Sequence, residues 1–215
     1  ILFDRNYQNR YTDPGNFVTK RNKMGSYVLV LQEGNVFLNG AGYSEKGQFP
    51  FIDKMNLFSK KVSKLYQSEY TDKLENINNY DAEQNQLLVR IESPNEYPNY
   101  FIRDLNKNNL SQLTNFPNPF KSIQDIHKEV IDYKREDGLN LSGILYLPLG
   151  YDMDKKEKMP MILWAYPREF KDQASAAQKT SNPNKFTYPH YGSPIYWVTK
   201  GYVVLDKATF PIVGE

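Results

Sequence analysis

Short runs of apolar and β-branched residues, separated by turn-forming residues, dominate the first 125 positions of the chain. The runs lie at residues 27–31, 36–38, 86–91 and 100–102. This pattern predicts β-strands, and the almost wholly apolar run at 27–31 predicts a buried one. We expect Asn39-Gly40 to form a hairpin turn, because both residue types tolerate positive φ. The first half is therefore expected to be built of strands.

A faint internal repeat also runs through this part of the chain. The segment MNLFSKKVSKL at 55–65 resembles RDLNKNNLSQL at 103–113, 48 residues further on. Both place apolar residues on either side of a polar turn, as in the outer hairpin of a propeller blade. Blades recur about every 40–50 residues, so about two would fit here. Two unrelated hairpins of a β-sandwich are the alternative.

The pattern changes after about residue 125. Residues 127–135 and 139–147 predict two strands joined by a turn at Asp137-Gly138, and the apolar run 161–166 predicts a strand covered on both faces. A short helix is expected next, with Ser193 as N-cap, Pro194 at its first position and Gly201 as its stop. Residues 202–205 then predict another buried strand. This order indicates the start of an α/β-hydrolase sheet, although other α/β folds share it.

Composition narrows the function classes. The 27 Lys and Arg balance 25 Asp and Glu to a net charge of +2 without a basic cluster, so nucleic acid is not indicated as a partner. No apolar run approaches the roughly 18 residues of a membrane-spanning helix. The absence of cysteine excludes disulfides and thiol nucleophiles. It leaves the compartment open, and is compatible with a bacterial periplasmic or secreted protein.

A serine nucleophile is not found. Its usual setting is the G-x-S-x-G elbow, which requires two glycines around the serine. Ser26 and Ser193 each follow a glycine but lack the second one. His127 and His190, the two histidines, have no nucleophile in their motifs, so we expect ordinary structural roles for them.

A metal site is not indicated either. The Asp152-Met-Asp154 segment resembles the start of a calcium loop, which needs Gly at position six and Glu at position twelve. Glu157 and Leu163 stand there instead, and lysines nearby would repel a cation. We therefore expect neither a metal nor a cofactor.

Tyr166 is the candidate catalytic residue. It ends the run 161–166 and precedes Pro167, so we expect its side chain to project into a loop at the carboxyl end of the sheet. In α/β hydrolases the loop after the third strand contributes one donor to the oxyanion hole. A tyrosine hydroxyl can donate such a hydrogen bond. A packed aromatic side chain with a solvated hydroxyl is the alternative.

The ordered motifs of the chain resemble the prolyl oligopeptidase family of serine peptidases, particularly its glutamyl endopeptidase and dipeptidyl-aminopeptidase-like branch. The motifs are QFPFID (48–53), PNYF (98–101), LTNFPNP (113–119), YKREDG (133–138), GILYLP (143–148), GYD (150–152), LWAYP (163–167) and PIVGE (211–215). The resemblance implies that residues 1–125 are the last blades of a β-propeller and that 126–215 begin an α/β-hydrolase peptidase domain. It also implies that Tyr166 helps to form the oxyanion hole.

The same resemblance places the elbow serine, the aspartate and the histidine beyond Glu215. We therefore expect an internal fragment of a peptidase, inactive alone, whose parent enzyme cleaves peptide substrates. Exposed strand edges are expected to make the fragment self-associate. A non-catalytic propeller-type binding protein and a degenerate peptidase homologue are the alternatives. The substrate residue, endo- or aminopeptidase action and the native oligomeric state stay open.

Overall fold

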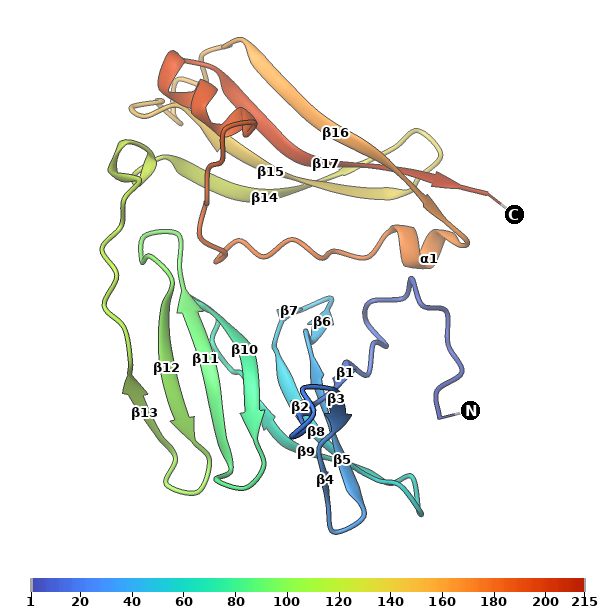
Figure 1. The fold of residues 1–215 in the computed structure, drawn as a ribbon. Helices are drawn as coiled ribbons and strands as arrows, with labels where there is room; N and C mark the ends of the chain where they lie inside the picture. The colour runs from blue at the N-terminus through green and yellow to red at the C-terminus, as the bar shows by residue number, and fades with distance from the viewer. Residues whose placement is uncertain (1, 215) are drawn as a thin grey trace. The chain divides into compact units, whose positions relative to one another are not determined.

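The computed structural model describes residues 2–214, and strands make up most of the ordered elements (Figure 1). The chain divides into two compact units. The first comprises residues up to Glu92 together with Pro98–Phe116, and the second comprises Ser93–Tyr97 and the residues from Pro117 onward. The fold is thus nearly all-β.

Two antiparallel sheets form most of the first unit. One has the order β1-β5-β8-β9, from strands Asn16–Phe17, Asn35–Gly40, Phe51–Asn56 and Val62–Gln67, and β4 (Leu31–Gln32) also pairs with β5. The other has the order β10-β11-β12-β13, from Leu74–Asp81, Gln86–Glu92, Asn99–Asp104 and Asn109–Gln112. The smaller pairs are β2 (Thr19–Arg21) with β3 (Tyr27–Leu29), and β6 (Tyr43–Ser44) with β7 (Gly47–Gln48). The second sheet joins strands that follow one another along the chain, as a blade-like meander does, whereas in the first sheet the pair β6–β7 lies between β5 and β8 along the chain.

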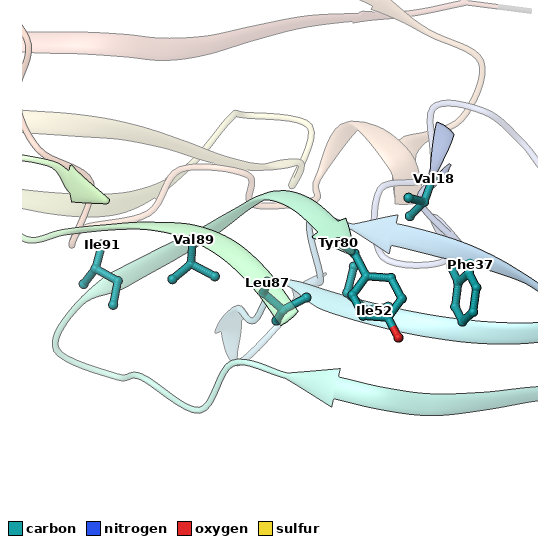
Figure 2. Packing of buried hydrophobic residues seen from close by; sticks show 7 residues of the cluster. All are labelled: Val18, Phe37, Ile52, Tyr80, Leu87, Val89 and Ile91. Carbon is teal, nitrogen blue, oxygen red and sulfur yellow. The ribbon is translucent and has the colours of Figure 1, made fainter. Parts of the chain in front are cut away.

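The core of the first unit combines residues of both large sheets. Figure 2 shows this cluster, formed by Val18, Phe37, Ile52, Tyr80, Leu87, Val89 and Ile91. Every second residue of β11 enters the cluster, because successive side chains of a strand point to opposite faces. The rings of Phe37 and Tyr80 meet edge to face at 5.0 Å between centroids. The two sheets therefore share one hydrophobic core.

The expected repeat corresponds to two equivalent hairpins, β8–β9 and β12–β13. In each, a side-chain oxygen accepts hydrogen bonds from the backbone N–H groups two and three residues later; Asn56 does so in the first hairpin and Asp104 in the second. Four residues further on, Lys60 and Asn108 adopt positive φ of 58° and 51°. The same local chemistry thus recurs 48 residues apart, as the sequence pattern predicted.

Two predictions for the first unit are wrong. Strand β3, expected to be buried, is exposed, because it pairs only with β2 in a two-stranded ribbon. Asn39 and Gly40 do not form a turn but lie in β5, opposite Ile52 and Phe51 of β8. The turn before β5 is Glu33-Gly34, with φ of 50° and 74°, and two consecutive positive φ values suit a tight hairpin.

The second unit contains a four-stranded mixed sheet of order β14-β15-β17-β16. Its strands are His127–Lys134, Asn140–Leu147, Val203–Val213 and Met161–Phe170, and β16 runs parallel to β17 while the other pairs are antiparallel. The connection from β16 to β17 carries α1 (Gln173–Ala176) and the 3-10 helix η2 (Pro194–Lys200); η1 (Lys121–Ile123) precedes β14. The expected order of strands and helix is present, with β16 and β17 extending beyond 161–166 and 202–205.

Local signals at the turn and the helix are confirmed. At the β14–β15 turn, the Arg135 guanidinium donates hydrogen bonds to both carboxylate oxygens of Asp137. These bonds, together with one from the Leu139 backbone N–H, lower the pKa of Asp137 to about 2. The Ser193 hydroxyl caps η2 by accepting from the Ile195 N–H at 3.4 Å. Gly201 ends the helix at φ 83°. The helix is 3-10 rather than α.

The prediction that residues 161–166 form a strand covered on both faces is wrong. Met161, Leu163, Trp164 and Tyr166 are all exposed. Strand β16 is the edge of the sheet, and the apolar clusters of this unit cover only its two ends. Ile162 joins a cluster with residues of η2 and β17, and Phe170 joins one with Ala176 of α1. Among residues 2–214, no helix is long and apolar enough to cross a membrane.

Candidate functional site

Tyr166 lies within strand β16, opposite Thr209 of β17. It does not end the strand as expected, because the parallel ladder with β17 continues through Pro167 to Phe170. Proline is tolerated there since β16 is an edge strand, whose outer N–H groups need no partner within the sheet. The side chain of Tyr166 is 70% exposed, so its hydroxyl is accessible from solvent.

The strand that pairs with Tyr166 is itself anchored to the next strand of the sheet. Thr209, its partner in β17, accepts a hydrogen bond through its hydroxyl from the Ser142 N–H of β15 at 2.9 Å. The Tyr166 ring meets the Trp164 ring at 5.9 Å between centroids and an interplanar angle of 75°. An exposed tyrosine with an anchored backbone and one fixed ring neighbour can present a hydrogen-bond donor in a defined direction.

Alternate residues of β16 share the face that carries Tyr166. Ile162, Trp164, Tyr166, Arg168 and Phe170 follow the period of two of a strand. Two contacts support this arrangement: the Trp164–Tyr166 ring pair and the Arg168 guanidinium 5.5 Å from the centre of the Phe170 ring. Ile162 and Phe170 are packed into clusters at the two ends, so the three residues between them form an exposed polar and aromatic strip.

The other residues weighed as candidates have structural partners. Ser193 caps η2, and Ser26 donates its backbone N–H to Asn22 in a turn. His127 lies 3.6 Å from Glu129, and His190 accepts from the Gly192 N–H at 3.2 Å. These interactions of the two histidines involve no serine hydroxyl.

The carboxylate of Asp152 is committed to a turn. It accepts from the N–H groups of Lys155 and Asp154 and pairs with the Lys155 ammonium at 3.3 Å, and these backbone bonds lower its pKa. Within residues 2–214, no group of three or more acidic, histidine or cysteine side chains is arranged to hold a metal.

Sequence reasoning missed a buried polar network in the first unit. Glu75 of β10 is fully buried, and one of its oxygens accepts from the Arg103 guanidinium of β12 at 2.7 and 2.8 Å. Its other oxygen accepts from the Tyr66 hydroxyl of β9. Burial, together with this bond, raises the Tyr66 pKa, and the carboxylate raises the Arg103 pKa against the effect of burial. Both carboxylate oxygens are occupied, so Glu75 is not available to bind a ligand. The network instead links the two sheets through hydrogen bonds.

Comparison with known proteins places the chain among peptidases. No family model matches it. It is 33% identical over 229 residues to a probable chloroplastic glutamyl endopeptidase of Oryza sativa subsp. japonica and 32% identical over 230 residues to one of Arabidopsis thaliana. Both alignments include all of this chain and 24% of the relative. The chain thus spans about a quarter of the length of the curated relatives it matches.

Solved structures share the fold at low sequence identity. Porphyromonas gingivalis dipeptidyl peptidase 4 matches with a TM-score of 0.54 and 15% identity, over 84% of this chain and 24% of the other. A putative dipeptidyl aminopeptidase IV from Bacteroides ovatus matches with a TM-score of 0.53 and 15% identity, over 89% and 28%.

These likenesses first define a class: the chain is a relative of strand-rich peptidases. The similarity to glutamyl endopeptidases along all of this chain then confirms the resemblance to prolyl oligopeptidase family peptidases that its motifs indicated.

Proposed function

We propose that this chain is part of a serine peptidase that hydrolyses peptide bonds through an acyl-enzyme. The observation that carries the proposal is the similarity to glutamyl endopeptidases along all of the chain. In the complete enzyme, a serine would attack the peptide carbonyl and a histidine would accept its proton. Because no G-x-S-x-G elbow occurs among the 215 residues, both are proposed to lie outside them, and the chain alone is proposed to be inactive.

In this proposal, residues 1–125 are the last blades of a β-propeller and residues 126–215 begin an α/β-hydrolase domain. The blade assignment is supported by the antiparallel meander β10–β13 and by the hairpin chemistry that recurs at Asn56 and Asp104. The hydrolase assignment is supported by the mixed sheet, in which an antiparallel pair precedes a parallel pair joined through helical turns.

Tyr166 is proposed to donate a hydrogen bond to the oxyanion of the tetrahedral intermediate. A donor fixed before the reaction stabilises developing charge more than one that must be oriented during it. The ladder with Thr209 and the contact with Trp164 fix Tyr166 in this way. Its exposure leaves the hydroxyl available to a substrate carbonyl.

The test uses the full-length protein encoded by the reading frame that contains this chain. Replacing Tyr166 by Phe is expected to lower kcat by about 10²–10³, the usual effect of losing one oxyanion donor. Tyr191→Phe is the matched control, since Tyr191 is fully exposed in a loop of the same unit, and it should leave kcat unchanged. Peptide hydrolysis is measured with an internally quenched substrate.

A fluorophosphonate probe separates the two parts of the proposal. The full-length protein should be labelled at a serine, and the 215-residue chain should not. Labelling of a serine within this chain would refute the proposed inactivity. A full-length protein without hydrolysis or labelling would identify a degenerate homologue or a binding protein.

A further inference from the structure

We propose that residues 178–185, which we call the flap, open and close against strand β14 between two fixed points of the second unit. The exposed ion pair of Lys179 with Asp132 is the latch that holds the flap closed. Salt that screens this pair therefore raises the open fraction. The inference concerns the second unit alone and does not depend on the proposed peptidase function.

The flap belongs to a long connection. Residues 177–193, between α1 and η2, form no helix or strand (Figure 1). Connections of more than about 12–15 residues without secondary structure are uncommon in compact units, and many of them act as lids or binding loops. The contacts along this connection indicate which part of it can move.

Buried side chains anchor the connection on both sides of the flap. Before the flap, Asp172 caps α1 by accepting hydrogen bonds from the Ser175 backbone N–H at 2.7 Å and from the Ser175 hydroxyl at 3.0 Å, and Ala176 is buried in an apolar cluster. After the flap, Phe186 is 6% exposed and its ring meets the Tyr97 ring edge to face at 5.2 Å between centroids. Buried apolar packing is stronger than an exposed polar contact, so these two points stay fixed.

The flap itself is held to β14 by exposed polar contacts. The Lys179 ammonium lies 2.5 Å from a carboxylate oxygen of Asp132, and the two side chains are 45% and 54% exposed. At the other end of the flap, Lys128 donates a hydrogen bond to the Lys185 backbone carbonyl. Because exposed ion pairs are weak and are screened by salt, we expect the contacts between flap and β14 to open before the anchors do.

A turn inside the flap allows it to move as one piece. The Asn182 side chain accepts a hydrogen bond from the Asn184 backbone N–H at 2.8 Å, and its backbone carbonyl accepts one from the Lys185 N–H at 3.2 Å. Both bonds join residues of the flap, so they are kept when the flap leaves the sheet.

The test measures the distance between two nitroxide labels by double electron–electron resonance, in the full-length protein and in a background without other cysteines. The 215 residues contain no cysteine. Labels are therefore introduced through Pro183→Cys in the flap and Glu136→Cys in the β14–β15 turn, both exposed positions. One short distance should dominate at low salt. Raising NaCl from about 0.1 to about 1 M shortens the Debye length from about 10 to about 3 Å. The ratio of long to short distances should then rise about two- to fivefold, as for the loss of an exposed ion pair.

Two variants remove the latch directly. Asp132→Asn should raise the ratio of long to short distances at low salt to the value that wild type reaches at high salt, and should remove the salt response. Lys179→Met should do the same. Glu129→Gln is the matched control, because Glu129 is another carboxylate of β14 and lies on the opposite face by strand alternation; it should leave the ratio unchanged.

A second label pair tests the fixed point at Phe186. Labels at Tyr191→Cys, beyond this anchor, and at Glu136→Cys should give one distance at every salt concentration. A long distance that already dominates between flap and turn at low salt, or a ratio that neither salt nor Asp132→Asn changes, would overturn the latch. A salt-dependent change at Tyr191 that parallels the change at Pro183 would overturn the two fixed points, since the whole connection would then move together.

Discussion

Glu75 shows how a buried charge is stabilised in the first unit. Its carboxylate is fully buried, and Arg103 and Tyr66 together occupy both of its oxygens. Removing one member of such a pair leaves a buried charge without compensation, which costs more than the pair itself contributes. The network is therefore expected to be the most sensitive polar position in this unit.

Glu75→Gln is predicted to lower the free energy of unfolding by about 3 kcal/mol, because the Arg103 guanidinium loses its counter-charge. Urea unfolding followed by far-ultraviolet circular dichroism measures this change. Glu83→Gln is the control, since the Lys20–Glu83 pair is exposed and should contribute less than about 0.5 kcal/mol. If the two variants proved equally stable, the Glu75 network would not contribute to the stability of the protein.

At the residue scale, the sequence marks Tyr166 as a candidate but does not predict its surroundings. Its place after an apolar run and before Pro167 marks the position, yet the strand continues past the proline because an edge strand tolerates it. The Glu75 network was not predictable, because its members come from three strands of two different sheets, and Arg103 lies 28 residues from Glu75 in the sequence. Only the packing of two sheets brings them together.

At the scale of elements, the sequence predicts which segments are strands better than it predicts which strands are buried. Alternation and turn residues correctly located the hairpins β8–β9, β12–β13 and β14–β15. An apolar run indicates that a segment prefers to form a strand. Whether the strand is buried depends on other elements that pack against its faces. Strands β3 and β16 are exposed because β3 belongs to a two-stranded ribbon and β16 is an edge strand.

A substitution at Gly40 distinguishes the observed position of this residue in strand β5 from the expected position in a turn. A Cβ atom at this position would lie 2.1 Å from the Phe51 ring on β8, so the strand has no room for it. Gly40→Ala is predicted to destabilise the protein by about 1–3 kcal/mol through overpacking, as measured by thermal or urea unfolding. In an exposed turn the same change would have little to clash with.

A double variant tests whether the clash with the Phe51 ring causes the loss of stability in Gly40→Ala. Gly40→Ala combined with Phe51→Leu should cost less than the sum of the two single changes, since the smaller side chain removes the clash. Gly192→Ala is the control, because its nearest neighbour would be 3.6 Å away. Additive effects in the double variant would place the cost of Gly40→Ala somewhere other than Phe51.

At the scale of the whole molecule, the edge of the mixed sheet is the feature that we expect to promote association in solution. Strand β16 pairs on one side only, with β17. Its backbone groups on the other side form a template for a further strand, and Met161 and Leu163 add exposed apolar surface along it. Pro167 lacks an N–H, so pairing at this edge is restricted to the residues before it.

We predict that the 215-residue chain self-associates through this edge. Sedimentation velocity should show species heavier than the 25.1 kDa monomer whose proportion rises with concentration. Leu163→Lys should shift the distribution toward monomer, because a charged side chain on an edge strand opposes strand addition. Leu149→Lys is the control: Leu149 is also exposed but follows β15 in a loop, so its substitution should leave association unchanged.

A wild-type chain that stays monomeric at every concentration would show that the edge of β16 does not recruit a second copy. Equal effects of the two lysine substitutions would point to general charge rather than strand pairing as the cause.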